Sequence, residues 1–150
     1  MDKVKVLFLC SGNSARSQMA EAFLRRYAGE RFEVYSAGLE PKGINPYTLK
    51  VMNELGYDLA GHYAKSLDQF LGKVHFGYLI TVCDRAAEAC PIFPGMGTRL
   101  QWSFDDPAAF EGTDEEKTAK FRQVRDQIEK RVKAWFEEMQ LVFAQDMSAR

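Results

Sequence analysis

The sequence predicts a single-domain α/β fold built on a parallel sheet. Short apolar runs rich in β-branched and aromatic residues alternate with segments of helical period, which is typical of strand–helix–strand units. The 150 residues suffice for one hydrophobic core, and no internal repeat, linker or low-complexity segment divides residues 1–150. Glycines close several of the segments, as expected where the chain turns.

Four runs of the sequence are predicted to be strands. In chain order they are residues 4–9, 32–36, 76–82 and 100–104. The first and third runs are almost continuously apolar, as expected of parallel strands that are buried on both faces. The second run alternates briefly and is closed by Gly38. A loop-like stretch from Pro91 to Gly97, with two prolines and two glycines, precedes the fourth run.

The remaining segments have helical periodicity. Helices are expected over residues 14–28, from Pro46 to Gly56, over a short stretch at 66–71 and over a long C-terminal stretch. Thr113 and Glu116 have the spacing of a capping box at the start of the last helix. Apolar residues then recur at steps of three and four from Phe121 to Met139, and the tail beyond about residue 143 is expected to fray.

Composition and charge exclude several classes of function. The formal net charge is −1, so no overall basic field favours nucleic acid or an anionic membrane, and any selectivity for anions must be local. No apolar stretch is long enough to span a bilayer and no secretory signal is expected, so we expect a cytoplasmic protein. Nothing in the sequence suggests more than a monomer. In a reducing compartment the three cysteines, Cys10, Cys83 and Cys90, indicate reactive roles rather than a disulfide framework.

Reactive side chains follow three of the predicted strands. Cys10, Cys83 and Asp105 come directly after the first, third and fourth strands. The carboxyl ends of parallel strands meet at one edge of the sheet, where ligands bind in open α/β folds. We therefore expect these three side chains to share a site.

The loop after the first strand has the features of an anion-binding cradle. It reads Cys10-Ser11-Gly12-Asn13-Ser14-Ala15-Arg16-Ser17 and opens into a predicted helix. Backbone N–H groups of such a loop and the helix N-terminus favour an oxyanion, and Arg16 can bind two of its oxygens. The same positive field favours the thiolate of Cys10. The alternative, a small buried cysteine and a surface arginine, leaves the surrounding strand, glycine and helix unexplained.

Several motifs resemble the low-molecular-weight tyrosine phosphatase superfamily. Besides the C-x-G-N-x-x-R-S loop, the matching stretches are residues 35–38, Asn45-Pro46, the pair Cys83 and Cys90, residues 102–108 and residues 112–117. The stretch from Gln18 to Glu21 resembles more closely the thioredoxin-coupled arsenate reductase branch. The resemblance covers nearly the whole chain. It implies three layers, with a four-stranded parallel sheet of order 2-1-3-4 and helices on both faces.

This resemblance implies an enzyme that converts arsenate to arsenite in arsenic detoxification. Cys10 would attack arsenate, Cys83 would attack the Cys10 sulfur so that arsenite leaves, and Cys90 would then take over the disulfide for reduction by thioredoxin. Because the two disulfides cannot coexist, the stretch between Cys83 and Cys90 must change shape, and its alanines suit a weakly packed helix. The resemblance implies no cofactor, and phosphate and sulfate would compete as oxyanions.

The resemblance also implies an acid and supporting groups. It places the general acid at Asp105, and the alternatives are the adjacent Asp106 or an aspartate that merely caps a turn. Asn13 and Ser17 would support the loop and the thiolate through hydrogen bonds.

One departure from the family pattern concerns a cation. Asn13, Glu21 and Ser36 match groups through which some members bind potassium near the loop. Lys65 stands where those members have a carboxylate. An ammonium there would replace the metal's charge and pair with Glu21, so we predict no potassium dependence; the alternative is that Lys65 points to water. Ala15, where many relatives carry cysteine, is not needed in a relay of three thiols.

Three functions fit the sequence. The first is arsenate reduction, and the second is hydrolysis of phosphotyrosine. Gln18 stands where phosphatases usually have proline, and no aromatic pair lies beside Asp105 in the sequence, so the first is favoured. Residual phosphatase activity is expected in either case, because phosphate and arsenate share shape and charge. The third function is that of a non-catalytic oxyanion or redox sensor.

A metal site is not predicted. The sequence has no Cys-x-x-Cys, and His62 and His75 lie far from each other, so each histidine is expected to be structural or exposed. The alternative that Cys83 and Cys90 are ordinary core residues stays open at this point.

Overall fold

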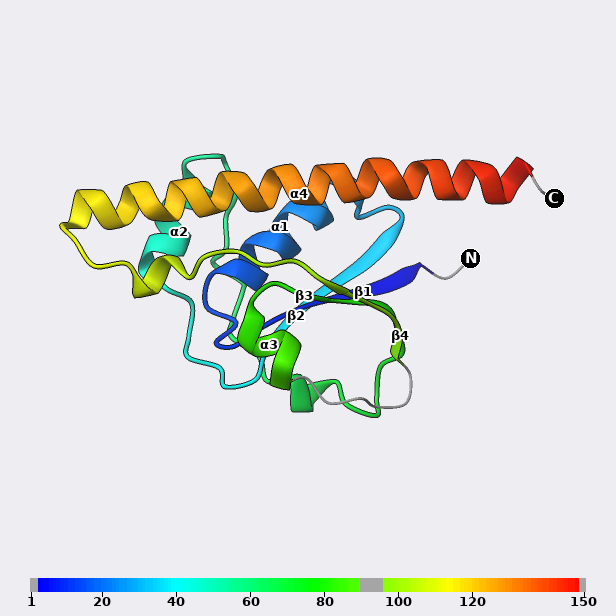
Figure 1. Ribbon diagram of the computed structural model, residues 1–150, viewed down its shortest axis with the longest axis horizontal. Helices are drawn as coiled ribbons and strands as arrows, with labels where there is room; N and C mark the ends of the chain where they lie inside the picture. The colour runs from blue at the N-terminus through cyan, green and yellow to red at the C-terminus, as the bar shows by residue number, and fades with distance from the viewer. Residues whose placement is uncertain (1–2, 90–95, 149–150) are drawn as a thin grey trace.

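The computed structural model describes residues 3–89 and 96–148, and its fold is the predicted α/β class (Figure 1). Four parallel strands form one sheet in the order β2-β1-β3-β4, which confirms the order that the resemblance implied. The elements in chain order are β1 Val4–Cys10, α1 Arg16–Ala28, β2 Phe32–Gly38, α2 Pro46–Asn53, η1 Leu67–Gln69, β3 Phe76–Thr81, α3 Asp84–Ala89, β4 Met96–Gln101, η2 Pro107–Ala109 and α4 Asp114–Ser148.

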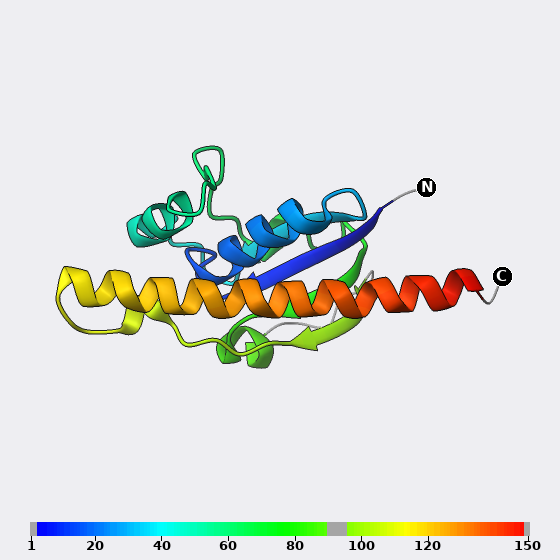
Figure 2. The same ribbon diagram turned by 90° about the horizontal axis from the view of Figure 1, so that it is seen from above.

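Helices cover both faces of the sheet. α1 and the long α4 lie on one face and α3 lies on the other (Figures 1 and 2). On the first face, the ring of Tyr78 in β3 lies 5.2 Å from that of Trp135 in α4. On the second, the ring of Tyr35 in β2 lies 5.4 Å from that of Phe70, directly after η1. The sheet is therefore the middle of three layers.

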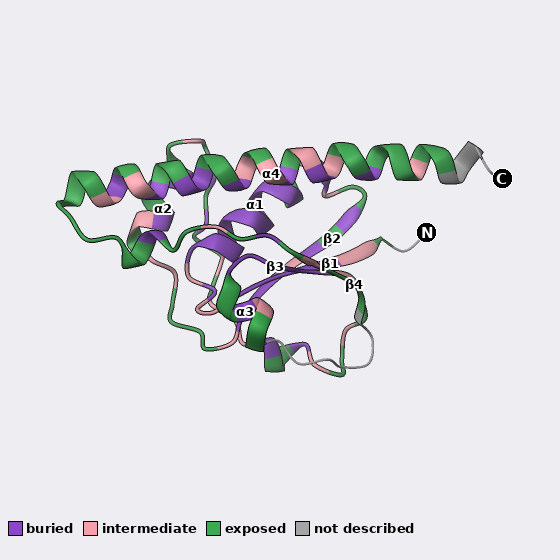
Figure 3. Ribbon diagram, viewed as in Figure 1, coloured by how far each residue is buried: buried purple, intermediate pink, exposed green. Residues whose placement is uncertain are grey.

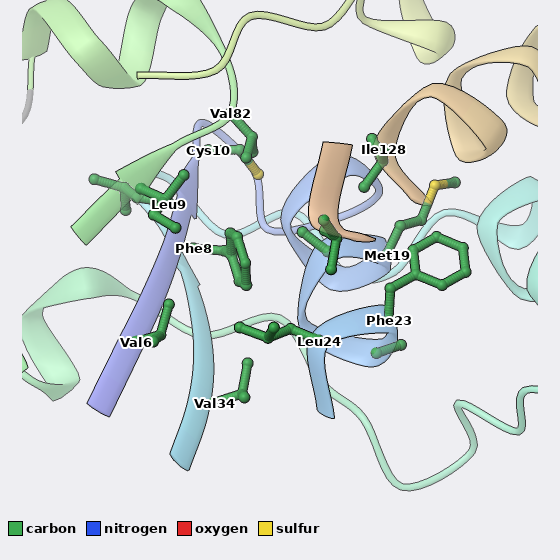
Figure 4. Close-up of a cluster of buried hydrophobic side chains, with 14 of the residues drawn as sticks. Val6, Phe8, Leu9, Cys10, Met19, Phe23, Leu24, Val34, Val82 and Ile128 are labelled. Atoms are coloured by element: carbon green, nitrogen blue, oxygen red, sulfur yellow. The ribbon is translucent and has the colours of Figure 1, made fainter. Parts of the chain in front are cut away.

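The core between β1 and α1 supports the loop that joins them. Phe8 of β1 points toward α1, whose Leu24 faces the sheet, while Phe23 lies on the side of α1 away from the strands (Figure 4). All three side chains are fully buried, and Ile128 of α4 closes the cluster from outside. Cys10 belongs to the same cluster at the end of β1. Its position is thus fixed by packing on rigid elements.

The predicted fourth strand is wrong in its bounds. It was expected at 100–104, whereas β4 is Met96–Gln101 and the chain leaves the sheet at Trp102. The ring of Trp102 lies 5.8 Å from Phe8 and 6.1 Å from Trp135, so it packs into the core. The Trp102 N–H still donates to the Thr81 carbonyl of β3 at 2.8 Å, but its side chain belongs to the core, and the apolar alternation after residue 100 reflects this packing.

A glycine lies inside β4, where the sequence predicts a loop. A Cβ on Gly97 would lie 2.5 Å from the carbonyl oxygen of Gly77 in β3. Real side chains do not tolerate such a contact, so the two strands can approach this closely only at glycine. Gly97 is therefore a strand residue that resembles a loop residue in the sequence.

α4 begins as predicted and ends later. Thr113 and Glu116 form the expected capping box, with reciprocal N–H···O bonds of 3.1 and 3.2 Å. The stretch after residue 143, where fraying is expected, is helical to Ser148, and the ring of Phe143 lies 6.0 Å from that of Phe32. Its outer side is largely exposed (Figure 3). None of the helices within residues 3–89 and 96–148 could cross a membrane.

The other predicted helices are present with different bounds. α2 ends at Asn53, before Gly56, which has a φ of +83°. η1 occupies three residues of the predicted stretch 66–71. α1 begins at Arg16 and not at Ser14, so the loop after β1 is longer than predicted. The alanine-rich stretch after the third strand forms α3, the expected short helix.

Candidate active site

The sulfur of Cys10 lies buried at the carboxyl end of β1, beside Val82 (Figure 4). The backbone N–H of Asn13 donates to this sulfur at 3.1 Å. The hydroxyl oxygen of Ser17 lies 2.8 Å from it. Both groups can donate to a thiolate, and hydrogen bonds to an ionised acceptor are stronger than neutral ones. The surroundings of Cys10 therefore suit a sulfur anion.

The carbonyl groups of the Cys10 loop, residues 10–17, are held from outside. The N–H groups of Leu39, Glu40 and Lys42 donate to the carbonyl oxygens of residues 10–12, at 3.1, 2.8 and 3.1 Å. The loop is therefore tied along its length to the segment that follows β2. These bonds use carbonyl oxygens only, so they do not occupy the N–H groups of the loop.

Several N–H groups of the loop lack an acceptor in the part of the chain that the structure describes. They belong to Gly12, Ser14 and Ala15. α1 also has no side-chain cap at its N-terminus. A helix start with unpaired N–H groups binds anions, because the donors and the helix dipole act together. The loop is thus a cradle for an oxyanion.

Asn13 fixes the shape of the loop. Its φ is +49°, in the left-handed region that asparagine tolerates better than most residues. Its side-chain amide donates to Ser17 at 2.8 Å, and its Oδ1 accepts from Gln18 Nε2 at 3.0 Å and from the Lys65 N–H at 2.8 Å. Sequence reasoning assigned no role to Gln18, which is fully buried and also donates to the Asn13 carbonyl at 3.2 Å.

The arginine of the loop is anchored by the segment after β4. Arg16 is largely buried, donates from Nη1 to the Phe104 carbonyl at 3.1 Å, and has Nη2 3.8 Å from Asp106 Oδ2. Asp105 instead accepts a bond of 3.0 Å from Lys120 of α4, and its side chain is 74% exposed. The structure thus places Asp106 beside Arg16, while Asp106 also caps η2.

A second thiol lies beside the cradle. Cys83 follows β3, is buried, and has its sulfur 3.9 Å from the hydroxyl oxygen of Ser11. The N–H of Ala86, in α3, points to the Cys83 sulfur at 3.4 Å. Cys10 and Cys83 are both free thiols. Cys90, the third predicted thiol, lies outside the described residues.

A buried carboxylate lies near Lys65, the residue whose N–H bonds the Asn13 side chain. Glu21 of α1 is 4% exposed and accepts a bond of 2.6 Å from the Ser36 hydroxyl. Arg25 Nη1 lies 2.9 Å and Lys65 Nζ 3.8 Å from its oxygens. The Lys65 side chain is only 11% exposed, so it faces the protein and not water. Two cations and a hydroxyl thus compensate the charge of Glu21.

His62 completes this cluster, although sequence reasoning gave it no functional role. Its Nδ1 lies 3.1 Å from Gln18 Oε1 and 3.5 Å from Glu21 Oε2. Burial lowers the pKa of His62, with a smaller opposing effect from Glu21, so the neutral ring is favoured. A cavity of about 560 Å³ beside the cluster includes no residue of the Cys10 loop. No group of three metal-binding side chains occurs within the described ranges.

The chain is similar over most of its length to known proteins. The family described as low molecular weight phosphotyrosine protein phosphatase matches residues 5–143. An arsenate reductase from Halalkalibacterium halodurans is 48% identical over 138 residues, which are 91% of this chain and 98% of the relative.

Solved structures show the same similarity. One, described as an arsenate reductase in the phosphate binding state, has a TM-score of 0.75 and 29% identity, and covers 90% of this chain and 98% of its own. Another, the thioredoxin-dependent arsenate reductase Cg_ArsC1' of Corynebacterium glutamicum, has a TM-score of 0.71 and 30% identity. It covers 93% of this chain and 63% of its own.

Proposed function

The chain belongs to the low-molecular-weight phosphotyrosine protein phosphatase family, and from there we propose that it reduces arsenate to arsenite with thioredoxin as reductant. The observation that carries this proposal is the second thiol, because the Cys83 sulfur lies 3.9 Å from Ser11 in the Cys10 loop. Hydrolysis of a phosphate ester needs no second thiol, whereas reduction needs one that can receive the oxidation from Cys10. The arsenate reductases of similar sequence and fold support the same choice.

Binding of arsenate is the first step. The oxyanion occupies the cradle of residues 11–17, where the N–H groups of Gly12, Ser14 and Ala15 donate to its oxygens. Arg16 adds a fixed positive charge and a planar pair of donors. Phosphate and sulfate have the same tetrahedral shape and compete for this cradle.

Chemistry begins at the Cys10 sulfur. The thiolate attacks arsenic(V), a hydroxide leaves and takes up a proton as water, and a Cys10–arsenic bond forms. The thiolate of Cys83 then attacks the Cys10 sulfur, and the sulfur–arsenic bond breaks with its electron pair left on arsenic. Arsenic is reduced to arsenite, and the two sulfurs are oxidised to the Cys10–Cys83 disulfide.

Regeneration uses the third cysteine. Cys90 as thiolate attacks the Cys83 sulfur, which releases Cys10 as thiolate and leaves a Cys83–Cys90 disulfide. A dithiol of thioredoxin reduces that disulfide and is itself oxidised. We place the enzyme in the cytoplasm, because thioredoxin keeps thiols reduced in that compartment. We also propose that it acts as a monomer.

Asp105 is the proposed general acid for the leaving oxygen. Its carboxyl group bonds Lys120 at 3.0 Å, so it must leave Lys120 before it can protonate the arsenate oxygen. Asp106 is suited to a different role, because it already faces Arg16 at 3.8 Å and caps η2. Asn13 and Ser17 support the loop and the Cys10 thiolate.

Lys65 is proposed to take the place of a potassium ion. Its ammonium lies 3.8 Å from Glu21, and the N–H of Lys65 bonds Asn13 Oδ1 at 2.8 Å. The same residue therefore contacts the buried carboxylate and the residue that shapes the loop. Ser36 completes the group through its 2.6 Å bond to Glu21. Activity is accordingly independent of potassium.

Two assays test this proposal side by side. The first follows arsenate-dependent oxidation of NADPH with thioredoxin and thioredoxin reductase, and the second follows hydrolysis of p-nitrophenyl phosphate. The wild-type protein is active in the first assay, Cys83→Ser is inactive in it, and Cys10→Ser is inactive in both. Hydrolysis by the wild type without any arsenate reduction would refute the reductase.

Phosphatase activity is the second candidate function. The cradle and Cys10 suffice to bind a phosphate ester and form a phosphocysteine, so residual hydrolysis is expected. Cys83→Ser distinguishes the two activities, because it retains p-nitrophenyl phosphate hydrolysis while it abolishes arsenate reduction. A sensor without catalysis would show neither activity.

A further inference from the structure

Lys42 lies on the rim of the Cys10 loop, in the segment that joins β2 to α2 (Figure 1). Its N–H donates to the Gly12 carbonyl at 3.1 Å. Its Cβ, Cγ and Cδ each lie 3.7 Å from the point that a Cβ on Gly12 would occupy. The aliphatic stem thus runs along the loop, and the residue as a whole is exposed. The stem is thus fixed beside the loop, on a residue that is open to water.

The neighbouring cations at this edge of the sheet are paired with carboxylates. The pairs are Arg16 with Asp106 at 3.8 Å, Lys120 with Asp105 at 3.0 Å and Arg85 with Glu40 at 2.6 Å. Asp84, at the start of α3, accepts a bond of 2.6 Å from Ser103. Among the described residues, the Lys42 ammonium has no carboxylate partner. It is therefore the cation at this rim whose charge is available to an incoming anion.

We propose that Lys42 captures dianionic tetrahedral oxyanions at the mouth of the cradle and so increases their affinity and rate of entry. The inference rests on the proposed function of the Cys10 loop as an oxyanion site. Arg16 cannot serve this purpose alone, because it is buried and already bonded to the Phe104 carbonyl at 3.1 Å. An exposed lysine meets the dianion before the cradle does, and the nearby loop then receives it.

The effect of Lys42 on oxyanion affinity can be estimated from the attraction between its charge and a dianion in water. A unit charge and a dianion about 10 Å apart in water attract each other enough to change affinity by about threefold at 10 mM salt. At 0.5 M salt the screening length is only about 4 Å, and the effect disappears. The dependence of the effect on salt therefore distinguishes capture by charge from a structural role of Lys42.

Lys42→Met is the appropriate variant, because methionine keeps an unbranched stem over Gly12 and removes the charge. Lys42→Arg keeps both. Lys73→Met is the matched control: Lys73 is exposed, precedes β3 and so lies at the opposite end of the sheet. Each variant is titrated with inorganic phosphate by calorimetry and assayed for kcat/KM with p-nitrophenyl phosphate and with arsenate, at 10 mM and 0.5 M salt.

Lys42→Met is expected to weaken phosphate binding and lower both kcat/KM values about threefold at 10 mM salt, through KM and not kcat. Lys42→Arg and Lys73→Met retain the wild-type values, and all proteins converge at 0.5 M salt. Equal losses in Lys42→Met and Lys73→Met, or a loss that persists at 0.5 M salt, would overturn the proposal. If the wild type binds phosphate but does not reduce arsenate, the reductase fails while the phosphate titration still decides the role of Lys42.

Discussion

Gly38, the last residue of β2, lies against the backbone of the Cys10 loop. A Cβ there would lie 2.7 Å from the Asn13 nitrogen, 2.9 Å from the Gly12 carbonyl carbon and 2.9 Å from the Ser11 oxygen. These backbone atoms cannot rotate away as a side chain could. The chain cannot retreat freely on the other side either, because the Gly38 N–H donates to a carbonyl at 2.8 Å. Gly38→Ala must therefore displace the loop.

Gly38→Ala is expected to reduce both stability and oxyanion binding. Overpacking of this kind costs about 1–3 kcal/mol of unfolding free energy. Displacement of one donor to a charged ligand costs about 1.5–3 kcal/mol, so phosphate affinity falls at least about tenfold. Urea unfolding, followed by the fluorescence of the buried Trp102 and Trp135, measures the first effect. Calorimetric titration with phosphate measures the second.

The matched control for this variant is Gly61→Ala. A Cβ on Gly61 meets no atom within 4 Å, so the same change should leave stability unaltered or raise it by about 0.4–1 kcal/mol. Phosphate affinity should stay at the wild-type value. If Gly38→Ala matched Gly61→Ala in both measurements, the close approach of β2 to the loop would not be what sets the loop's shape.

Three further predictions test the surroundings of the site and the fold. Ser17→Ala removes the 2.8 Å contact to Cys10 and should lower kcat for p-nitrophenyl phosphate about tenfold in steady-state assays, whereas an unchanged kcat would exclude support of the thiolate. Lys65→Met should lower the urea unfolding free energy by about 1–3 kcal/mol, because it leaves Glu21 with one cation fewer. The Tm of the wild type should be equal in potassium chloride and sodium chloride, and a higher Tm in potassium would show that Lys65 does not replace the ion. Arg122 holds the pKa of Glu54 at about 2, below its ordinary 4.5, so ionised Glu54 adds stability that is lost as the pH falls from 4.5 toward 2. In urea unfolding, the advantage of wild type over Glu54→Gln should shrink across that range, and a constant difference would count against the ion pair.

The strands could be predicted where periodicity and burial agree. β1 and β3 are almost continuously apolar runs, as expected of the two central strands of a sheet covered on both faces. The fourth strand was misplaced because Trp102 is apolar for a tertiary reason, its contacts with Phe8 and Trp135. Gly97 resembles a loop residue in the sequence, but position 97 must be glycine because the backbone of Gly77, on the neighbouring strand, leaves no room for a Cβ. Such contacts have no local signature.

At the site, too, local motifs could be predicted from the sequence, and contacts between distant segments could not. The cradle is a contiguous motif, so its residues could be named from the sequence, and the structure brings Cys10, Asn13 and Ser17 into contact. The bonds that support it join distant segments: Gln18 meets His62 across 44 positions. The bond of Asp105 to Lys120 is likewise set by the packing of α4 and not by neighbouring residues.

The most direct test of the account uses Cys90→Ser, in which the relay should stop after its second sulfur. One equivalent of arsenate is added to the reduced protein without thioredoxin, arsenite is quantified, and the digested protein is examined by mass spectrometry. We expect close to one arsenite per chain and one disulfide that joins Cys10 to Cys83. Arsenite release with both thiols still reduced, or no reaction of arsenate with a protein that binds phosphate, would contradict it.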